Sequence, residues 1–211
     1  MNTTQYILEK YGKTDYQGEM PIQLDILRDD LAGLFNELNL NVGVEIGVAG
    51  GRFSQILLEG HPNMQLTGVD PYLSYDEYFD FKTQEIISGF IPSMKKRIDK
   101  HKDRFKLIQK TSLEAVKDFK DNSLDFVYID GNHLFQYVVN DLAEWGKKIK
   151  SGGIISGHDF EVRRKPDCIH AEEVVRGWTA AYDIKPWFIT KRARRYNQDG
   201  NVHRSFFWEK I

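Results

Sequence analysis

Acidic residues and histidines recur in this sequence at the ends of short apolar runs. The residues concerned are Glu45, Asp70, Asp130, His133, His158 and Asp159. Carboxylates accept hydrogen bonds from hydroxyl and amino groups and bind divalent cations, and a neutral imidazole can accept a proton near pH 7. If the fold brings these positions together, they predict a polar binding site with acid–base groups beside it.

Strands and helices alternate around these residues. Short apolar runs predict strands over 41–47, 65–70, 105–109, 124–130, 154–157, 187–190 and 204–209. Apolar residues at helical spacing, together with residues that favour helix starts, predict helices over 25–38, 53–59, 92–101, 112–119, 135–149 and 172–182. We expect Gly152 and Gly153 to close the helix over 135–149. We expect an α/β fold, a doubly wound Rossmann-like sheet of seven strands, mostly parallel, with a C-terminal antiparallel hairpin. Ligands bind such sheets at the carboxyl ends of the strands.

Composition excludes several classes of protein. The 211 residues carry 29 Lys and Arg against 31 Asp and Glu, a balance that disfavours wrapping of nucleic acid. No apolar run approaches the roughly 20 residues that span a bilayer, and the N-terminus lacks a signal-peptide pattern. The single Cys168 excludes an internal disulfide framework and fits a reducing compartment. We expect one cytoplasmic domain without membrane attachment.

The turn Glu45-Ile-Gly47-Val-Ala-Gly-Gly51-Arg52 is rich in glycine, which lets a ligand approach the backbone closely. A dinucleotide fingerprint would need glycine where this chain has Ala49 and Arg52, which disfavours a nicotinamide-linked oxidoreductase. The Glu45 carboxylate disfavours a pyrophosphate and favours an amine-bearing ligand. The alternative is a tight strand-to-helix turn that binds nothing.

Asp70 ends the second strand of this core, 25 positions after Glu45. A carboxylate at that place can accept both hydroxyls of a ribose. The alternative is a turn or capping aspartate before Pro71. The glycine-rich turn upstream favours the ribose role.

Four segments together resemble class I S-adenosylmethionine-dependent methyltransferases. They are VEIGVAGG (44–51), VDPY (69–72), LDFVYIDGNH (124–133) and KSGGIISGHDF (150–160). The resemblance is strongest to small-molecule O-methyltransferases of the catechol-type and sugar-modifying branch. It implies a single methyltransferase domain over 1–211, with an N-terminal helical segment (1–40), a cofactor-binding core (41–160) and a C-terminal helix and hairpin (161–211).

The resemblance implies S-adenosylmethionine as cofactor and S-adenosylhomocysteine as product. In that family the first loop holds the methionine part, the acidic residue after the second strand holds the ribose, and the loop after the third strand flanks the adenine. The cofactor-binding residues expected on this basis are Glu45, Gly47, Val48, Ala49, Gly51, Ser54, Asp70, Pro71, Tyr72, Thr111, Ser112 and Asp130.

Asp130, His158 and Asp159 form a second group, at the ends of two strands that lie about 4.8 Å apart if they pair. They are candidate ligands for Mg²⁺ or Mn²⁺. The metal-dependent branch of the resembling family usually has an acidic residue where this chain has His158. The metal-free alternative is that Asp130 contacts the methionine end while the other two bind substrate or hydrogen-bond locally.

His133, and after it His158, are the candidate catalytic bases that deprotonate the acceptor hydroxyl; the alternative for each is a histidine that orders a loop. We expect a small-molecule acceptor. The basic segment 161–195 suggests an anionic one, unless that segment is a solvated edge. Aromatic residues over 72–90 predict a lid or ordinary loop packing.

Two further expectations concern partners and function class. No Asn-Pro-Pro-Tyr base pocket follows the fourth strand, so a nucleic-acid substrate is not expected. The sequence leaves the oligomeric state open and is compatible with a homodimer. The main alternative to an enzyme is a non-catalytic S-adenosylmethionine- or nucleotide-binding protein of the same fold.

Overall fold

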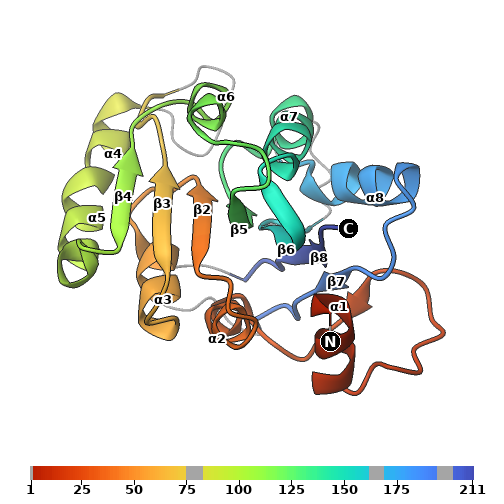
Figure 1. The fold of residues 1–211 in the computed structure, drawn as a ribbon. Helices are drawn as coiled ribbons and strands as arrows, with labels where there is room; N and C mark the ends of the chain where they lie inside the picture. Colours follow the sequence, from red (N-terminus) through yellow and green to blue (C-terminus); the bar gives the residue numbers. More distant parts are fainter. Residues whose placement is uncertain (1, 75–82, 162–168, 194–201) are drawn as a thin grey trace.

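The computed structural model describes residues 2–74, 83–161, 169–193 and 202–211. One eight-stranded sheet, in the order β1-β7-β8-β6-β5-β2-β3-β4, forms its centre (Figure 1). The strands are β1 (Ile22–Gln23), β2 (Val42–Ile46), β3 (Gln65–Val69), β4 (Phe105–Ile108), β5 (Leu124–Ile129), β6 (Ile149–Gly157), β7 (Phe188–Ile189) and β8 (Phe206–Glu209). Paired strands are parallel except at β8, which is antiparallel to β6 and to β7. The expected doubly wound, mostly parallel sheet with a C-terminal antiparallel hairpin is confirmed.

Helices cover both faces of the sheet. They are α1 (Thr3–Lys10), α2 (Leu31–Glu37), α3 (Arg52–Gly60), α4 (Gln84–Ser88), α5 (Phe90–Ile98), α6 (Ser112–Ala115), α7 (Phe135–Gly146) and α8 (Ala171–Ala181), with 3₁₀ turns η1 (Arg28–Asp30), η2 (Asp99–His101) and η3 (Val116–Asp118). In Figure 1, α1, α2 and α3 lie below the sheet and α6, α7 and α8 above it. In the described residues no helix combines the length and apolar character needed to cross a membrane.

The central strand β5 shows why the sheet has two cores. Phe126 and Tyr128 point into the core that the sheet shares with α2 and α3. Val127 and Ile129 point into the opposite core, with α7 and α8. This alternation follows from the two-residue period of a strand. Both faces are apolar because both carry helices, as is usual for a parallel sheet.

The eighth strand, β1, is the one that the sequence analysis missed. Ile22 and Gln23 pair in parallel with Phe188 and Ile189 of β7. Two residues are too few to show a period in the sequence. The helix predicted over 25–38 is also shorter than expected: η1 precedes it and α2 begins only at Leu31.

The boundary between α7 and β6 also differs from the prediction. The helix ends at Gly146, and Gly152 and Gly153 lie inside β6 rather than closing the helix. The register between β5 and β6 shifts at this point. Gly152 has φ +82°, and a Cβ on Gly153 would lie 2.4 Å from the carbonyl oxygen of Asp125, so both glycines serve an irregular strand that approaches β5 closely.

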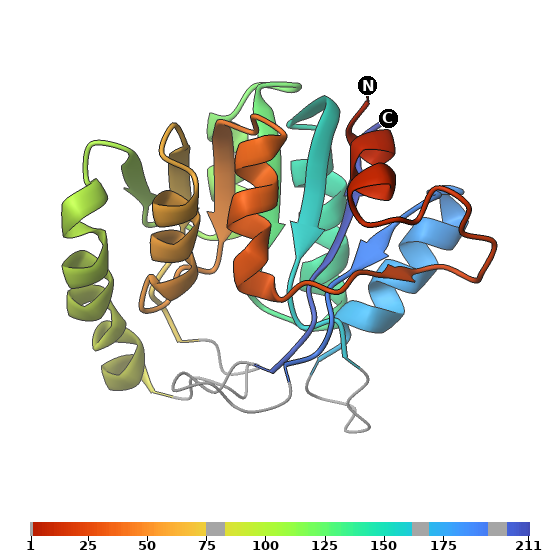
Figure 2. The ribbon, with the colours of Figure 1, turned by 90° about the horizontal axis from the view of Figure 1, so that it is seen from below.

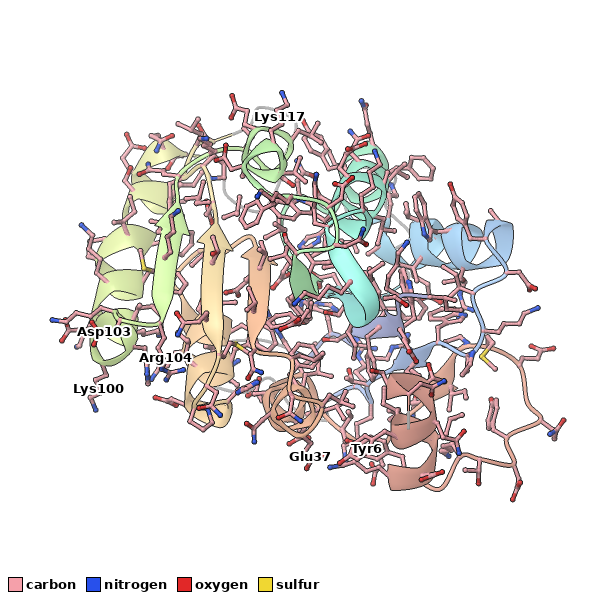
Figure 3. The ribbon with its side chains drawn as sticks, in the orientation of Figure 1. Tyr6, Glu37, Lys100, Asp103, Arg104 and Lys117 are labelled. Carbon is pink, nitrogen blue, oxygen red and sulfur yellow. The ribbon has the colours of Figure 1, made fainter. Side chains whose placement is uncertain are left out.

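Hydrogen bonds join the N-terminal helix α1 to strands β6 and β8 of the sheet. The Thr4 amide donates to Oε2 of Glu209 (2.6 Å), and the Thr3 hydroxyl donates to the Gly152 carbonyl (2.6 Å). The Tyr6 hydroxyl donates to Oε2 of Glu37 on α2 (2.9 Å; Figure 3). Helices α1, α2 and α3 lie side by side on one face of the sheet, where α2 also packs against α3 (Figure 2).

Candidate active site

Four strand ends meet at one edge of the sheet. The last paired residues of β2, β3, β5 and β6 stand in register with one another. The residues that follow them are Gly47, Asp70, Asp130 and His158. Parallel pairing therefore brings together groups that are far apart in the sequence, as we expected.

Gly47 opens the turn after β2 in a conformation that requires glycine. Its φ is +86°, and a Cβ there would lie 2.1 Å from the carbonyl oxygen of Asp130. Its amide donates to the Val69 carbonyl (2.8 Å). The turn is thus packed against the neighbouring strand ends on both sides.

Asp70 organises two loops through backbone hydrogen bonds. Its Oδ2 accepts from the amides of Val48 (3.0 Å) and Ala49 (2.8 Å), and its Oδ1 accepts from the amide of Tyr72 (2.8 Å). The Tyr72 hydroxyl donates to the Ala49 carbonyl (2.9 Å). Burial raises the pKa of the Asp70 carboxyl, and the backbone amides oppose that shift. The turn role that we considered for Asp70 is therefore present, and it does not use every lone pair of the carboxylate.

A cavity of about 350 Å³ opens beside this edge. Eight of the predicted cofactor residues line it, namely Gly47, Ala49, Asp70, Pro71, Tyr72, Thr111, Ser112 and Asp130. Four do not: Glu45, Val48, Gly51 and Ser54. Glu45 and Ser54 are fully buried beneath the turn, where the Ser54 hydroxyl donates to Glu45 Oε2. Burial raises the pKa of Glu45 to about 8, although Ser54 and Arg28 favour its charged form.

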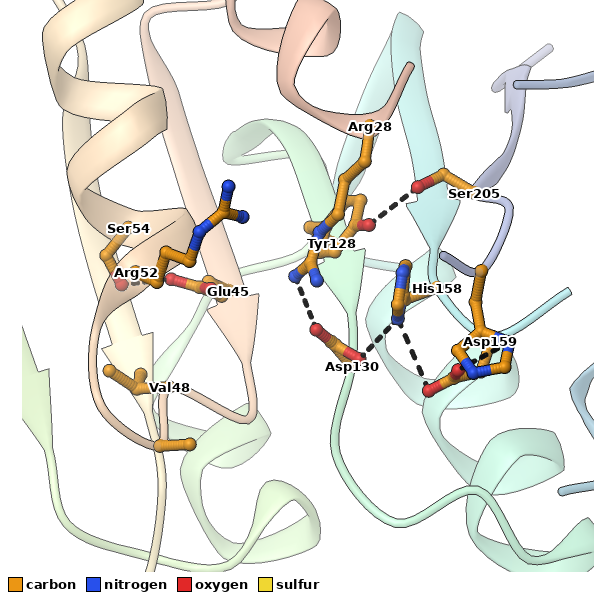
Figure 4. Close-up of polar contacts among 12 residues, drawn as sticks. Arg28, Glu45, Val48, Arg52, Ser54, Tyr128, Asp130, His158, Asp159 and Ser205 are labelled. Carbon is orange, nitrogen blue, oxygen red and sulfur yellow. Dashed lines mark hydrogen bonds and ion pairs between the residues drawn. The ribbon is translucent and has the colours of Figure 1, made fainter. Parts of the chain in front are cut away.

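Beside the cavity two carboxylates and two imidazoles are in contact. Figure 4 shows His158 between Asp130 and Asp159. His133 Nε2 lies 2.8 Å from Asp159 Oδ2 and 3.8 Å from Asp130 Oδ1. His158 Nδ1 lies 3.3 Å from the same oxygen of each aspartate. Asp159 has φ +53°, a strained conformation for a non-glycine residue and one that clusters at functional sites. The two predicted bases and the two predicted metal-binding carboxylates thus form one cluster.

The carboxylates favour the protonated form of both imidazoles. Burial lowers the pKa of His158, as does Arg28, but Asp159 and Asp130 outweigh both and raise it to about 9. Burial also lowers the pKa of His133, but Asp159 outweighs burial, so the pKa of His133 is raised above its usual value. Burial raises the pKa of Asp130, but the charges of Arg28 and His158 lower it by more. The pKa of Asp130 therefore lies below its usual range. The carboxylates therefore work against the neutral imidazole that we expected near pH 7, most clearly at His158.

Arg28 is a site residue that the sequence analysis missed. Its Nη2 donates to Asp130 Oδ2 (2.5 Å; Figure 4), and its guanidinium carbon lies 4.1 Å from the centre of the Phe53 ring. Next to it, Arg52 pairs with Asp29 (2.9 Å). The ion pair between Asp29 and Arg52 thereby joins the segment before α2 to the end of the glycine-rich turn after β2. Arg28 follows no strand end, so the pattern that found the other residues could not find it.

Comparison with known proteins decides the family. Residues 44–160 match the family model described as a methyltransferase domain, which is more than half of the chain. The chain belongs to this methyltransferase family. The family resemblance inferred from the four sequence segments is confirmed.

The methyltransferase also resembles curated proteins and solved structures. Uncharacterized proteins of Sinorhizobium fredii and of Acanthamoeba polyphaga mimivirus are each 26% identical to it, over 70% and 63% of this chain. The chain spans only 15% and 57% of the lengths of those two relatives.

Solved O-methyltransferases share its fold at low sequence identity. A Bacillus cereus O-methyltransferase in complex with SAH is 14% identical, with a TM-score of 0.59 over 99% of this chain and 90% of that one. A putative caffeoyl-CoA O-methyltransferase from Staphylococcus aureus is 12% identical, with a TM-score of 0.61 over 97% and 91%. TomG from Streptomyces achromogenes, solved with SAM, is 11% identical, with a TM-score of 0.57 over 99% and 89%.

Helix α7 contributes cavity residues of the methyltransferase that the sequence analysis did not select. Tyr137, Asn140 and Asp141 lie on one face of this helix and line the cavity. The spacing of three and four residues was readable in the sequence. It was overlooked because only strand ends were searched for chemistry.

Two loop predictions are tested only in part. Tyr72 and Phe90 of the expected aromatic lid line the cavity, while residues 75–82 lie outside the described chain. In the basic segment 161–195, residues 162–168 and 194–195 lie outside it. The lysines and arginines of this segment that the structure describes each pair with a carboxylate. The pairs are Arg176 with Glu172, Lys185 with Asp183, Lys191 with Asp25 and Arg192 with Glu161.

Proposed function

We propose that this methyltransferase uses S-adenosylmethionine to methylate a hydroxyl oxygen of a small molecule and releases S-adenosylhomocysteine. One observation carries the proposal: Asp130 lines the same cavity as Gly47 and Ala49 of the first glycine turn, and it also belongs to the cluster of two carboxylates and two imidazoles. A cofactor pocket and a proton-handling group therefore share one residue. The solved relatives named above, two of which carry SAH or SAM, support the cofactor and the oxygen acceptor.

When bound, S-adenosylmethionine supplies an electrophilic methyl group on a sulfonium. The chain's own residues have three tasks. The backbone around Gly47 accommodates the methionine part because no Cβ obstructs it. Asp70 accepts the ribose hydroxyls with its remaining lone pairs. Asp130 accepts from the methionine ammonium group.

The acceptor hydroxyl loses a proton as its oxygen takes the methyl group, and the cluster receives that proton. His133 is the proposed base because its imidazole contacts Asp159 and lies next to the cavity residue Asp130. Its raised pKa strengthens it as a base and disfavours the neutral form that accepts the proton. His158 is the second proposed base. Holding the acceptor oxygen in line with the methyl group also lowers the barrier. Positioning of this kind contributes up to about 7–11 kcal/mol in well-oriented systems.

We further propose that the cluster holds Mn²⁺ or Mg²⁺. One donor atom from each of Asp130, His133 and Asp159 lies within 4.8 Å of the other two. Carboxylate oxygens with an imidazole nitrogen fit a divalent cation, and the nitrogen favours Mn²⁺. The cation would lower the pKa of the acceptor hydroxyl. With a cation bound, His133 would be a ligand rather than the base, and the base role would pass to His158. His158, the third ligand predicted from the sequence, contacts both carboxylates and is the alternative nitrogen donor.

An anionic acceptor, a homodimer and a cytoplasmic location remain predictions from the sequence. The ion pairs of the described basic residues support a solvated edge over an anion site in that part of segment 161–195. A nucleic-acid substrate is still not expected.

Calorimetric titration tests the function directly. S-Adenosylmethionine and S-adenosylhomocysteine are titrated into the protein with and without Mn²⁺ or Mg²⁺, and micromolar binding is expected. Asp70→Ala should abolish binding, whereas Asp99→Asn, an exposed carboxylate on η2, should leave it unchanged. Absence of binding under every metal condition contradicts the proposal, and unchanged affinity in Asp70→Ala contradicts the ribose role. Affinity that does not respond to either cation contradicts the metal site.

A further inference from the structure

A hollow of about 490 Å³ lies between helices α3 and α5, which pack against each other at one end of the molecule (Figure 2). The side chains that line it can all donate hydrogen bonds, and none of them is acidic. They are Gln55, Ser93, Lys96, Arg97 and Lys100. None of these residues lines the cavity or belongs to the cluster of the proposed function. The hollow is therefore a separate candidate site.

The basic residues of the hollow lie on one face of a helix. From Ser93 to Lys100 the lining residues follow at intervals of three and four positions, from α5 into η2. Residues at this spacing are neighbours on a helix surface, and like charges there repel each other. In the part of the chain that the structure describes, no carboxylate pairs with Lys96, Arg97 or Lys100. An anion bound in the hollow would relieve this repulsion.

The lack of acidic partners distinguishes the hollow from the basic segment 161–195. The described lysines and arginines of that segment pair with carboxylates of the chain itself. Basic residues are also favoured at the end of a helix without any ligand, because they compensate the helix dipole. That preference explains the charge at the end of α5. It does not explain why a hydroxyl (Ser93) and an amide (Gln55) join the cations around a hollow.

Arg97 also connects the hollow to the glycine-rich turn of the proposed cofactor site. Its Nη1 donates to the Gly50 carbonyl (2.7 Å), and a Cβ on Gly50 would lie 2.9 Å from the same nitrogen. A guanidinium has five N–H donors, so this bond leaves donors for a ligand. An anion that draws the guanidinium towards the hollow would weaken its hydrogen bond to Gly50.

We propose that the hollow binds a small anion with two or three linked phosphate groups, and that Arg97 couples this site to the cofactor turn. Phosphate oxygens accept strong hydrogen bonds from arginine and lysine, which matches a lining made of donors. Three cations around about 490 Å³ fit a short chain of phosphate groups better than a single one.

Two carboxylates beside the hollow favour a small anion over a nucleic acid. Glu59 accepts from Gln55 Nε2 (2.9 Å) and lies 3.8 Å from His101 Nε2, and Asp99 directly precedes Lys100. A nucleic-acid backbone needs an extended positive surface, which these negative charges interrupt. A compact anion contacts only the lining of the hollow.

Calorimetric titration with inorganic tripolyphosphate, in buffer free of divalent cations, tests the site. The wild type should bind it, and Lys96→Gln/Lys100→Gln should weaken binding at least about tenfold, because two charge-assisted hydrogen bonds are lost. Lys117→Gln/Lys120→Gln is the matched control. It removes the same charge from exposed lysines, of which Lys117 lies well apart from Lys100 (Figure 3), and should keep the wild-type affinity. The site is overturned if the wild type does not bind, or if the two double variants bind equally well.

The coupling is measured with S-adenosylhomocysteine, so this part of the inference rests on the proposed function. Saturating tripolyphosphate should weaken binding of S-adenosylhomocysteine to the wild type at least about fivefold, and the reverse effect should have the same size. In Arg97→Gln the two ligands should bind independently. An affinity for S-adenosylhomocysteine that does not respond to tripolyphosphate in the wild type overturns the coupling.

The hollow variant separates coupling from direct competition. In Lys96→Gln/Lys100→Gln the effect of tripolyphosphate on S-adenosylhomocysteine should disappear. If the effect persists there, tripolyphosphate enters the cofactor cavity itself, and the coupling is overturned. If S-adenosylhomocysteine does not bind at all, the proposed function fails, whereas the tripolyphosphate titration still tests the hollow by itself.

Discussion

The Arg28 guanidinium and the Asp130 carboxylate form an ion pair, with Nη2 2.5 Å from Oδ2. The pair joins the segment before α2 to the end of a central strand. Only 12% of the arginine side chain and 15% of the aspartate side chain are exposed. Each charge therefore depends on the other, because water can compensate neither of them fully.

Replacing Arg28 with glutamine is expected to lower the free energy of unfolding by about 3 kcal/mol, since it leaves a buried carboxylate with less compensation. Urea unfolding at pH 7 measures this loss. Arg52→Gln, which breaks the more exposed pair with Asp29, should cost under about 1 kcal/mol. Asp130→Asn added to Arg28→Gln should recover part of the loss. Equal losses for the two arginines would contradict the special role of Arg28.

His133→Asn is expected to reduce kcat about 100-fold or more, which is the usual contribution of a general base. Its affinity for S-adenosylhomocysteine should stay within threefold of the wild type, because His133 does not line the cofactor cavity. Methyl transfer to a panel of phenols and sugars, together with calorimetry, separates the two effects. His101→Gln on η2 serves as a control remote from the cavity. Loss of binding and turnover in parallel would assign His133 a structural role.

Stability should fall as pH rises because of Glu45. The pKa of this buried carboxyl is raised from 4.5 to about 8, so between these values the folded protein keeps a proton that the unfolded chain has lost. Its contribution is thus fully present below pH 4.5 and is lost by pH 8. Glu45→Gln, neutral at every pH, should remove a decline on the order of 3 kcal/mol. Urea unfolding at four pH values between 5 and 8 measures the slope.

Glu59→Gln, exposed on the helix that follows Glu45, is the control for this slope and should leave it as in the wild type. A slope in Glu45→Gln identical to that of the wild type would show that the carboxyl ionises without cost in the folded protein.

Gly47→Ala is expected to lower the Tm and to abolish cofactor binding. The added Cβ would meet the carbonyl oxygen of Asp130 at 2.1 Å in a backbone conformation with φ +86°. Gly177→Ala is the counterpart in the middle of α8, where a Cβ meets nothing within 4 Å. There alanine should stabilise the helix by up to about 1 kcal/mol. Thermal unfolding of both variants checks the pair, and a tolerated Gly47→Ala would contradict the tight packing of the turn.

The strand ends were predictable because short apolar runs mark each strand, and the residue that follows each run can be read directly from the sequence. Apolar runs identify β2, β3 and β5, and parallel pairing then places Gly47, Asp70 and Asp130 at one edge. The proximity of Asp130 to Asp159 followed from the same rule. These predictions required only that neighbouring strands pair.

The residues that were missed depend on tertiary packing. Arg28 reaches Asp130 across 102 positions of the chain from a 3₁₀ turn, and no local pattern marks that contact. Asp141 looks like an ordinary polar position of an amphipathic helix until Ser112 and Trp145 are placed beside it. The charge state of His133 depends on the distance to Asp159, which spacing along the chain does not give.

Ala49 and Tyr72 both have left-handed backbones, with φ +44° and +49°, and they are joined by the hydrogen bond from the Tyr72 hydroxyl and by shared bonds to Asp70. The two loops therefore form a ring that is closed by hydrogen bonds within the chain itself. Such preorganisation moves the entropy loss of ordering the loops from the binding step to the folding step. A nucleoside that meets this rim finds its partners already oriented, so its association should be fast and should change the backbone little.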